Sequence, residues 1–414
     1  MIKKVLVVAE SIDVEDSSGT KGRVALIKNL HKAGFEVVVY HYTRDEIQLE
    51  GISCVNIKEN RRSLLFFLSR LERYIRYWLK FNPNKYIENL LGFSFTLFND
   101  RNSIFSELEK IKDFDPDLVL TLSKGGSFRP HHALLKIPEW HSKWMAYIHD
   151  PYPFAYYPRP YDWVEPGHQK KREFMMEVGK KAKYMAYPSK LLAEWMESYY
   201  RPSKGKAVII PHQIEEDVED QKEKIPDFFD SEKFNILHAG SLLWGRSPLG
   251  LINGFLRFLK DNPDAKENAR LILISGKNYH TKELNKLSKK HTELFVSGMA
   301  IPFEKTLVLQ SKASVNIILE AKGPISPFLP GKFPHCIKAG KPILLLGPIL
   351  SESRRLLGED FLFHAEIDDV HKIAKLIGLL YQNWKINSET EMNWSELRNY
   401  LSSSNLATTL KTKL

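Results

Sequence analysis

The hydrophobic residues of the chain fall into short apolar runs that alternate with segments of helical spacing. Residues 5–9 form such a run, which is typical of a parallel strand covered on both faces. A loop rich in turn residues follows at 16–22, and apolar residues at helical spacing then predict a helix over 23–33 that ends at Gly34. A second apolar run at 35–40 completes a strand–helix–strand unit, which predicts a parallel sheet with right-handed crossovers.

The same pattern starts again in the second half of the chain. The stretch 215–230 between the halves is acidic, contains proline and shows no periodicity, so we interpret it as a linker or surface loop. Further apolar runs predict strands at 117–121 and 144–148 in the first half, and at 234–239, 270–274, 293–296, 315–319 and 343–346 in the second.

Together the two patterns predict an α/β protein of two Rossmann-like, doubly wound parallel-sheet domains that face a cleft. The length of 414 residues agrees, because it exceeds what one ordinary hydrophobic core supports. We expect the first domain over residues 1–206 and the second over 207–390. A C-terminal helix and tail over 391–414 follows, which can return to the first domain.

Composition narrows the class of protein. Hydrophobic residues make up 43% of the chain and charged residues 27%, as in an ordinary soluble protein. No apolar stretch reaches the roughly 18–20 residues of a membrane span, and the N-terminal run is too short for a signal peptide, so we expect a cytoplasmic location. Two cysteines, Cys54 and Cys336, exclude a disulfide framework and a cysteine-based zinc site. The pair His131-His132 lacks a third ligand at metal spacing, so we predict no metal site.

The charge balance points to an anionic partner. The formal net charge is +10, which suits nucleic acid, anionic lipid headgroups or phosphorylated small molecules. The cations are dispersed and form no nucleic-acid motif, so we do not expect a nucleic-acid partner. Residues 61–81 combine arginines with large apolar residues at helical spacing. They predict an amphipathic helix that lies on an anionic membrane surface or, alternatively, packs its apolar face against the first domain.

Polar residues directly after predicted strands are the first candidates for a site, because ligands of doubly wound sheets bind beyond the carboxyl ends of the strands. Gly240, Ser241 and Arg246 lie between a strand and a helix, where backbone N–H groups and a guanidinium favour a phosphate. Lys332 and His335 follow a loop rich in proline and glycine at the start of a short helix. Ordinary loops with solvated basic side chains are the alternative in both cases.

In the first half, the strand predicted at 144–148 leads directly into His149 and Asp150. An imidazole at this place can hydrogen-bond a hydroxyl group of a ligand or accept a proton near neutral pH. Asp150 can orient the imidazole or contact the ligand itself. A capping pair at the end of the strand is the alternative interpretation.

The loop after the first strand contains Gly19, Lys21, Gly22 and Arg23. Small residues near the start of a helix permit close approach of a ligand, and the two cations suit an anionic one, which the family resemblance described below would make the acceptor. An ordinary mobile loop is equally compatible with this composition.

The second half resembles the donor domain of retaining GT-B glycosyltransferases of family 4 (glycosyl transferases group 1). Lys332 and the run Ala339-Gly340-Lys341-Pro342 match the family's closing pattern, and Arg246 stands at the position of a family lysine. Gly276 and Gly298 end two strands, as glycines near the nucleotide base do in that family. The order and spacing of such motifs extend over about residues 1–390.

The chain departs from the family pattern at its acidic positions. The family's two glutamates fall on Pro327 and His335, and Ser241 replaces a family arginine. Glu320, directly after a predicted strand, is a candidate for a displaced carboxylate that contacts the nucleotide, and a solvated glutamate is the alternative.

The resemblance implies a glycosyltransferase that moves a sugar from a UDP- or GDP-linked donor to a polysaccharide or glycolipid acceptor with retention of configuration. It places Arg246 and Lys332 on the diphosphate and His149 opposite the sugar, and it implies no cofactor beyond the donor and no metal. The expected place of work is the cytoplasmic face of a membrane. A sugar-nucleotide epimerase of the same fold and a catalytically degenerate nucleotide-binding protein remain alternatives.

Overall fold

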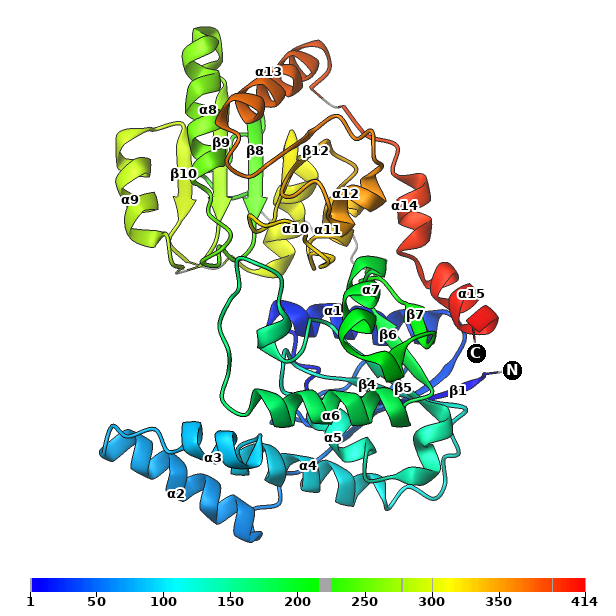
Figure 1. Ribbon diagram of the computed structural model, residues 1–414. Coiled ribbons are helices and arrows are strands. Elements are labelled where there is room, and N and C mark those ends of the chain that lie inside the picture. The colour runs from blue at the N-terminus through cyan, green and yellow to red at the C-terminus, as the bar shows by residue number, and fades with distance from the viewer. Residues whose placement is uncertain (1, 216–224, 277, 300, 389, 414) are drawn as a thin grey trace. The chain divides into compact units, whose positions relative to one another are not determined.

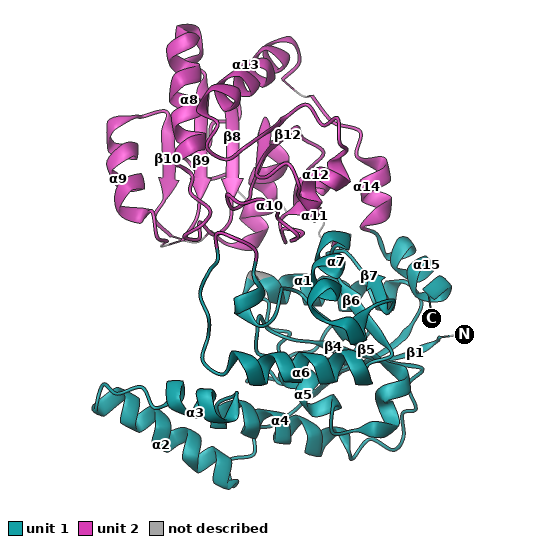
Figure 2. Ribbon diagram, viewed as in Figure 1, with its two compact units in different colours: residues 1–157, 161–213, 402–414 teal, residues 158–160, 214–401 magenta. Residues whose placement is uncertain are grey.

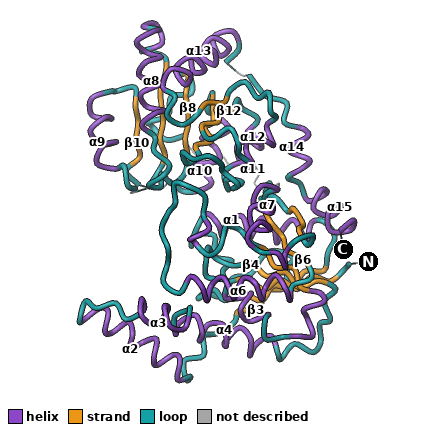
Figure 3. The backbone as a smooth tube through the Cα atoms, in the orientation of Figure 1, coloured by secondary structure: helices purple, strands orange, loops and turns teal. Residues whose placement is uncertain are grey.

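A computed structural model describes residues 2–215, 225–276, 278–299, 301–388 and 390–413. The chain divides into two compact units, which Figure 2 colours separately. Unit 1 comprises residues 1–157, 161–213 and 402–414, and unit 2 comprises residues 158–160 and 214–401. Each unit is built on a parallel sheet, seen as the two groups of orange strands in Figure 3. The predicted fold class of two doubly wound α/β domains is confirmed.

The sheet of unit 1 has the strand order β3-β2-β1-β4-β5-β6-β7. Its strands are β1 (Lys4–Ala9), β2 (Glu36–His41), β3 (Ser53–Asn56), β4 (Leu118–Leu122), β5 (Trp144–Tyr147), β6 (Tyr184–Tyr187) and β7 (Ala207–Ile209). Its α-helices are α1 (Ser18–Lys32), α2 (Leu64–Trp78), α3 (Asn84–Leu91), α4 (Phe95–Leu108), α5 (Arg129–Leu134), α6 (His168–Lys181), α7 (Lys190–Tyr199) and α15 (Ser403–Lys413) (Figure 1).

Strand β1 lies at the centre of this sheet, and its position explains its composition. Val5 aligns with Val37 of β2 on one side and with Leu118 of β4 on the other. Every residue of β1 after Lys4 is buried, because helices cover both faces of the sheet. A strand in this environment needs an uninterrupted apolar sequence, which is the pattern seen at residues 5–9.

Helix α1 begins five residues earlier than the sequence predicts. The side chain of Ser17 accepts a hydrogen bond from the backbone N–H of Thr20, so Ser17 caps the helix and Ser18 is its first residue. Gly19, Lys21 and Gly22 therefore lie in the first turns of a helix and not in a loop. The capping bond outweighs the low helix propensity of the two glycines.

Strand β7 moves the boundary between the units. The residues of β7 pair with β6 in the sheet of unit 1, and the main part of unit 2 starts at Ile214. The boundary that we expected between residues 206 and 207 would have placed β7 in the second domain. Residues 216–224 of the acidic stretch lie outside the described residues.

The end of the chain belongs to both units. Helix α14 (Ser395–Tyr400) is part of unit 2, whereas α15 is part of unit 1, where Leu406 and Leu410 join the core beside α1 residues such as Val24 and Ile27.

The sheet of unit 2 has the strand order β10-β9-β8-β11-β12-β13. Its strands are β8 (Phe234–Ala239), β9 (Ala269–Ile274), β10 (Leu294–Ser297), β11 (Val315–Leu319), β12 (Ile343–Leu346) and β13 (His364–Ala365). Its remaining α-helices are α8 (Leu249–Asp261), α9 (Thr281–Lys290), α10 (Phe303–Lys312), α11 (Phe333–Ala339), α12 (Glu352–Leu357) and α13 (Val370–Ile386).

Helices α8 and α13 pack closely on this sheet, and a glycine makes the contact possible. A Cβ atom on Gly254 of α8 would lie 2.5 Å from Cγ2 of Ile373 in α13. Phe258 of α8 and Tyr381 of α13 pack edge to face in the same core, with ring centroids 5.4 Å apart. The pairing fixes α8, and with it the loop that joins β8 to α8.

The packing of α15 gives a stability prediction. Leu406→Ala and Leu410→Ala each remove a side chain that is 1% exposed, so we expect each to lower the free energy of unfolding of unit 1 by about 2–5 kcal/mol. Thr408→Ala, at an exposed position of the same helix, is the matched control and should change it by less than about 0.5 kcal/mol. Chemical denaturation of the full chain measures both effects, and equal midpoints for all variants would show that α15 does not stabilise unit 1.

Candidate functional site

The carboxyl ends of the parallel strands of unit 2 bring most of the predicted site residues to one edge of the sheet. Gly240 follows β8, Gly276 lies just beyond β9, Gly298 follows β10 and Glu320 follows β11. Strands β8 and β11 are neighbours although they are not consecutive, so the strand order changes direction between them. Such a switch point is where doubly wound sheets bind their ligands.

Lys332 reaches this switch point from the residue before α11. Its Nζ atom lies 3.1 Å from Nδ1 of His238, a fully buried residue of β8. Gly240 has a positive φ of 145°, and a Cβ atom at this position would lie 3.2 Å from Lys332 Nζ. Glycine therefore leaves the space in which the ammonium group sits beside the end of β8.

The surroundings of Lys332 disfavour its positive charge. Burial and the nearby guanidinium of Arg246 lower the pKa of Lys332 to about 7. Burial, together with the same two cations, also holds the pKa of His238 well below its usual range, so this imidazole is neutral. A neutral His238 accepts a hydrogen bond from the ammonium form of Lys332.

Arg246 adds a second cation from the loop between β8 and α8. Its NH1 group donates to the backbone carbonyl of Ser241 at 3.4 Å, and its Nε atom is buried without a hydrogen-bond partner. Among the described residues, no carboxylate forms an ion pair with Arg246 or Lys332. Two cations without a paired carboxylate at the end of a strand form a site for an anion.

Glu320 is the buried carboxyl group of this edge. Its Oε1 atom accepts a hydrogen bond of 2.6 Å from Ser353, whereas Oε2 is buried with no hydrogen-bond partner. A Cβ atom on Gly347, the residue after β12, would lie 2.8 Å from that oxygen. Burial raises the pKa of Glu320 to about 7, although the hydrogen bond from Ser353 and the charge of Arg246 both act to lower it. The expectation of a solvated glutamate is therefore wrong.

The other predicted residues of unit 2 lie in less constrained places. Ser241 is exposed and contributes its carbonyl group to Arg246. The ring of His335 packs edge to face on Phe303 of α10, with centroids 5.1 Å apart. Gly298 has open space at its Cβ position.

Asn278, which the sequence patterns do not single out, holds the loop after β9. Its amide nitrogen donates to the Ser275 hydroxyl at 3.0 Å and to the Gly276 carbonyl at 2.9 Å. This loop also joins the ends of two strands, because the backbone N–H of Ser275 donates to the hydroxyl of Ser297 at 3.1 Å.

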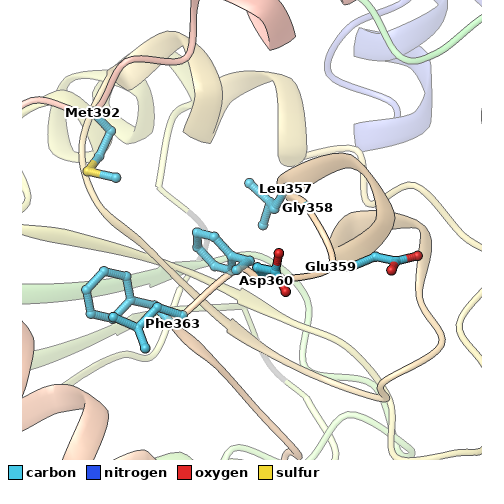
Figure 4. A pocket seen from close by; sticks show the side chains of 8 residues that line it. Leu357, Gly358, Glu359, Asp360, Phe363 and Met392 are labelled. Atoms are coloured by element: carbon cyan, nitrogen blue, oxygen red, sulfur yellow. The ribbon is translucent and has the colours of Figure 1, made fainter.

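A depression of about 390 Å³ lies elsewhere in unit 2 (Figure 4). Its lining residues are Leu357, Gly358, Glu359, Asp360, Phe361, Leu362, Phe363 and Met392. Residues 358–363 precede β13, so this depression lies by the amino end of a parallel strand, away from the switch point. It contains none of the predicted site residues and no cation.

In unit 1, His149 and Asp150 follow β5 after one intervening residue. The His149 ring lies 4.3 Å from that of Tyr147 and runs parallel to that of His212 at 6.4 Å. The Nε2 atom of His149 is buried without a partner, and burial with the nearby Arg23 holds the pKa of His149 well below its usual range. Burial also raises the pKa of Asp150 to about 6. No hydrogen bond joins these two described residues, so a role of Asp150 in orienting His149 has no support in the structure.

The start of α1 lies beside the same histidines. A Cβ atom on Gly22 would lie 3.6 Å from Nδ1 of His212, a residue that the sequence patterns above do not assign to the site. Arg23 is buried and donates to the carbonyl groups of Ser11 at 3.3 Å and Ser123 at 3.0 Å. Its guanidinium therefore joins two loops of unit 1, and the expectation that it meets an anionic acceptor is wrong.

An ionic network at the switch point between β1 and β4 also escaped sequence analysis. Glu10, directly after β1, accepts hydrogen bonds from the Lys124 backbone at 3.0 Å and from Arg129 at 2.5 Å. Arg129 donates in turn to Asp100 at 2.6 Å. The participating residues are far apart in sequence, so no local motif marks them.

Two further findings concern metals and membranes. No group of three histidine, cysteine or acidic side chains among the described residues is placed to hold a metal ion. None of the helices in the described part of the chain combines the length and hydrophobicity that crossing a bilayer requires.

Comparison with known proteins identifies the fold through solved structures and not through sequence. No family model and no curated protein sequence matches the chain. Solved structures do match over their whole length. The trehalose 6-phosphate synthase of Burkholderia multivorans superposes with a TM-score of 0.63 at 11% identity, covering 100% of this chain and 98% of that one. The UDP-forming trehalose-phosphate synthase of Burkholderia xenovorans in complex with glucose-6-phosphate gives 0.61 at 10% identity and covers 99% of both chains.

A third structure, the trehalose-6-phosphate enzyme from E. coli bound with UDP-2-fluoro glucose, gives a TM-score of 0.61 at 12% identity and covers 99% of this chain and 98% of that one. The fold is GT-B. These enzymes are GT-B glycosyltransferases of family 20, whereas the motifs of this chain resemble family 4, so what the chain shares with them is the GT-B fold.

The buried carboxyl group of Glu320 gives a pH prediction for the ligand-free protein. Its pKa of about 7 exceeds that of an unfolded glutamate, so the folded state binds the extra proton and stability falls as the pH rises from about 4.5 to 7. Glu320→Gln should abolish up to about 3 kcal/mol of this fall. Denaturation at pH 5 and pH 8 measures the difference, and identical pH profiles for the two proteins would contradict the burial of an unpaired carboxyl group.

Proposed function

We propose that the protein is a glycosyltransferase that transfers a sugar from a nucleoside-diphosphate sugar. One observation carries the proposal: the cations Lys332 and Arg246 lie at the switch point of a Rossmann-like sheet, and no carboxylate of the described residues forms an ion pair with either of them. The GT-B fold supports it, as does the structural neighbour bound with UDP-2-fluoro glucose.

The two cations can bind the diphosphate of the donor and stabilise the charge that develops on it when it leaves. The guanidinium of Arg246 can donate two parallel hydrogen bonds to a phosphate, while the ammonium of Lys332 acts as a point charge. During transfer, the bond from the anomeric carbon to the β-phosphate oxygen breaks and the diphosphate takes the electron pair. The acceptor's hydroxyl oxygen forms the new bond to the anomeric carbon, and its proton passes to the departing diphosphate. Groups that meet this growing charge lower the barrier, and a bound anion raises the pKa of Lys332 so that it stays charged. The proposal includes no cofactor beyond the donor.

Glu320 is proposed to take the role of the missing family carboxylates. Its unpartnered Oε2 atom is buried at the same edge as Lys332 and Arg246 and can accept a hydrogen bond from a hydroxyl of the donor. Gly240, Ser241, Gly276, Gly298 and His335 are proposed to line the nucleotide.

Unit 1 is proposed to supply the acceptor side. His149 is neutral, so its unpartnered Nε2 atom can form a hydrogen bond with a sugar hydroxyl without carrying charge. Asp150, with a pKa of about 6, is a second polar group at the same strand end. Gly19, Lys21 and Gly22 at the start of α1 are proposed to belong to the same side, since Gly22 lies beside His212, whose ring runs parallel to that of His149.

For the acceptor we propose the saccharide of a polysaccharide or glycolipid, with retention of configuration as the family resemblance implies. A sugar phosphate is the second candidate, since one neighbour is a complex with glucose-6-phosphate. Several unit 1 cations near the strand ends already have protein partners: Arg23 binds backbone carbonyls, Lys124 pairs with Asp16 at 2.5 Å, and Arg129 pairs with Glu10. This pairing favours the uncharged acceptor. An epimerase differs from both because it converts the donor with no acceptor.

The direct experiment is calorimetry with UDP, GDP and their sugars, followed by turnover with saccharide and sugar-phosphate acceptors. If a nucleotide binds but no mixture gives turnover, the chain is a catalytically degenerate nucleotide-binding protein. If the donor is converted without an acceptor, the chain is a sugar-nucleotide epimerase. Absence of nucleoside-diphosphate binding would refute the proposal.

The pKa of Lys332 predicts how nucleotide affinity depends on pH. Because the free lysine loses its proton above pH 7 and the bound one keeps it, the dissociation constant should rise by about tenfold per pH unit from pH 7 to 9. Lys332→Arg, which stays protonated, should remove this dependence, while Glu320→Gln should retain it. Titration calorimetry at three pH values tests this, and an unchanged slope in Lys332→Arg would exclude Lys332 from the phosphate site.

The role of His149 predicts a selective loss of catalysis. His149→Ala removes a hydrogen bond to the transferred sugar or the acceptor, so we expect kcat to fall by about a hundredfold while the affinity for the free nucleoside diphosphate stays unchanged. His31→Ala, at an exposed position of α1, is the control. Wild-type kcat in His149→Ala would remove this residue from the mechanism.

A further inference from the structure

Helix α2 turns a regular apolar stripe toward solvent. Leu64, Phe67, Leu71, Tyr74 and Trp78 follow one another at intervals of three or four residues, and each is between 55% and 73% exposed. Residues at this spacing lie on one face of a helix. In an ordinary surface helix such a face packs against the core.

The opposite side of α2 faces the rest of unit 1 with buried polar residues and with the half-buried apolar residues Leu65, Phe66, Leu68 and Ile75. Ser69 and Glu72 are its buried side chains, and its capping residue Ser63 hydrogen-bonds Asn99 of α4. The helix is thus attached through a mixed side, whereas its most apolar stripe is exposed, which is the reverse of the usual arrangement. The alternative in which residues 61–81 pack their main apolar face against the first domain is therefore wrong.

The apolar surface continues through the turn into α3. Tyr77, Leu79, Phe81, Tyr86, Leu90 and Leu91 are also exposed, and the rings of Phe81 and Tyr86 stack with centroids 5.7 Å apart. Of the 24 large exposed hydrophobic residues in the described chain, 11 lie between residues 64 and 91. We call residues 61–91 the α2–α3 hairpin; Figure 1 draws its two helices in blue and cyan. A concentration of this kind marks an interaction surface.

Cations surround the apolar stripe. The α2–α3 hairpin contains Arg61, Arg62, Arg70, Arg73, Arg76, Lys80 and Lys85 and only two acidic residues, Glu72 and Glu88. Its net charge of +5 is half that of the whole chain. Glu72 is buried beside Arg76 at 3.9 Å, and Glu88 pairs with Lys171 at 2.9 Å. Glu59, just before the hairpin, pairs with Arg61 at 3.3 Å and with Arg70 at 3.5 Å. Among the described residues, the cations without an ion-pair partner are Arg62, Arg73, Lys80 and Lys85, which stay available to an external partner.

We propose that the α2–α3 hairpin lies in the interface of an anionic lipid bilayer, with its apolar stripe among the acyl chains and its cations at the headgroups. Tyrosine and tryptophan side chains suit the depth of the headgroups, and clustered arginines suit anionic lipids. At 15 residues, α2 is too short to span a bilayer, so it lies in the plane of the membrane.

The charge argues against a second copy of the chain as the occupant. Two hairpins of charge +5 repel each other when they meet face to face. The stripe also covers only two heptads, fewer than the three or four that a coiled-coil pair requires. Membrane binding is independent of the proposed glycosyl transfer, and its test uses no activity.

Vesicle flotation of the full chain tests the proposal. Vesicles of phosphatidylcholine with 30% phosphatidylglycerol as an anionic probe, and of phosphatidylcholine alone, provide the two arms. We expect binding to the anionic vesicles that is at least about tenfold tighter than to the neutral ones. The triple variant Phe67→Ser/Leu71→Ser/Trp78→Ser should lose it, and Arg70→Gln/Arg73→Gln/Arg76→Gln should weaken it at least about tenfold.

Matched controls come from unit 2. Tyr279, Leu362 and Ile386 are as exposed as the stripe, and Lys282, Lys286 and Lys289 are three exposed cations of α9. Replacing either set by serine or glutamine, respectively, should leave binding within about twofold. Equal losses from the control variants, or equal binding to both kinds of vesicle, would overturn the proposal. Concentration-dependent dimerisation that the Phe67, Leu71 and Trp78 changes abolish, without vesicle binding, would assign the surface to a second copy instead.

Discussion

The burial of Lys332 near a second cation, Arg246, which repels its charge, is the constraint on which the site of unit 2 depends. Both cations lie at the end of β8, and no described carboxylate pairs with either, so the free energy of burying Lys332 appears as its lowered pKa. His238 accommodates the ammonium group only because burial keeps the imidazole neutral. An anion that enters this edge relieves the repulsion, which means that the folded protein holds a binding site at a cost in its own stability.

The geometry of a parallel sheet makes this arrangement possible. All the strands of unit 2 end at one edge, so loops from distant parts of the sequence meet there without long insertions. Close packing then fixes their positions: Gly254 lets α8 approach α13, and Gly240 leaves room for Lys332. Unit 1 follows the same plan, but the cations Arg129 and Arg23 at its strand ends are satisfied by protein groups. The two units therefore differ in electrostatics more than in fold.

Sequence patterns predict the sheets well because buried parallel strands need continuous apolar runs, as in β1, β8 and β11. A strand as short as β7 gives too weak an apolar pattern to be predicted, and for this reason the expected boundary between the units lies a few residues too early. The order of the motifs made Lys332, Arg246 and Glu320 candidate site residues. The protonation of Lys332 and Glu320 depends on their burial, to which Ser353 and His238 contribute, and no motif identifies these two residues. For α2 the sequence left two alternatives open, an outward apolar face or one packed on the first domain, since amphipathic spacing shows that a face exists and not what it contacts.

The position of a bound nucleoside diphosphate tests the central claim most directly. A crystal structure with UDP or GDP, whichever binds, should show phosphate oxygens within hydrogen-bond distance of both the Arg246 guanidinium and the Lys332 ammonium group. A nucleotide bound in the depression at residues 357–363, or at any site where neither cation touches the phosphates, would contradict the account.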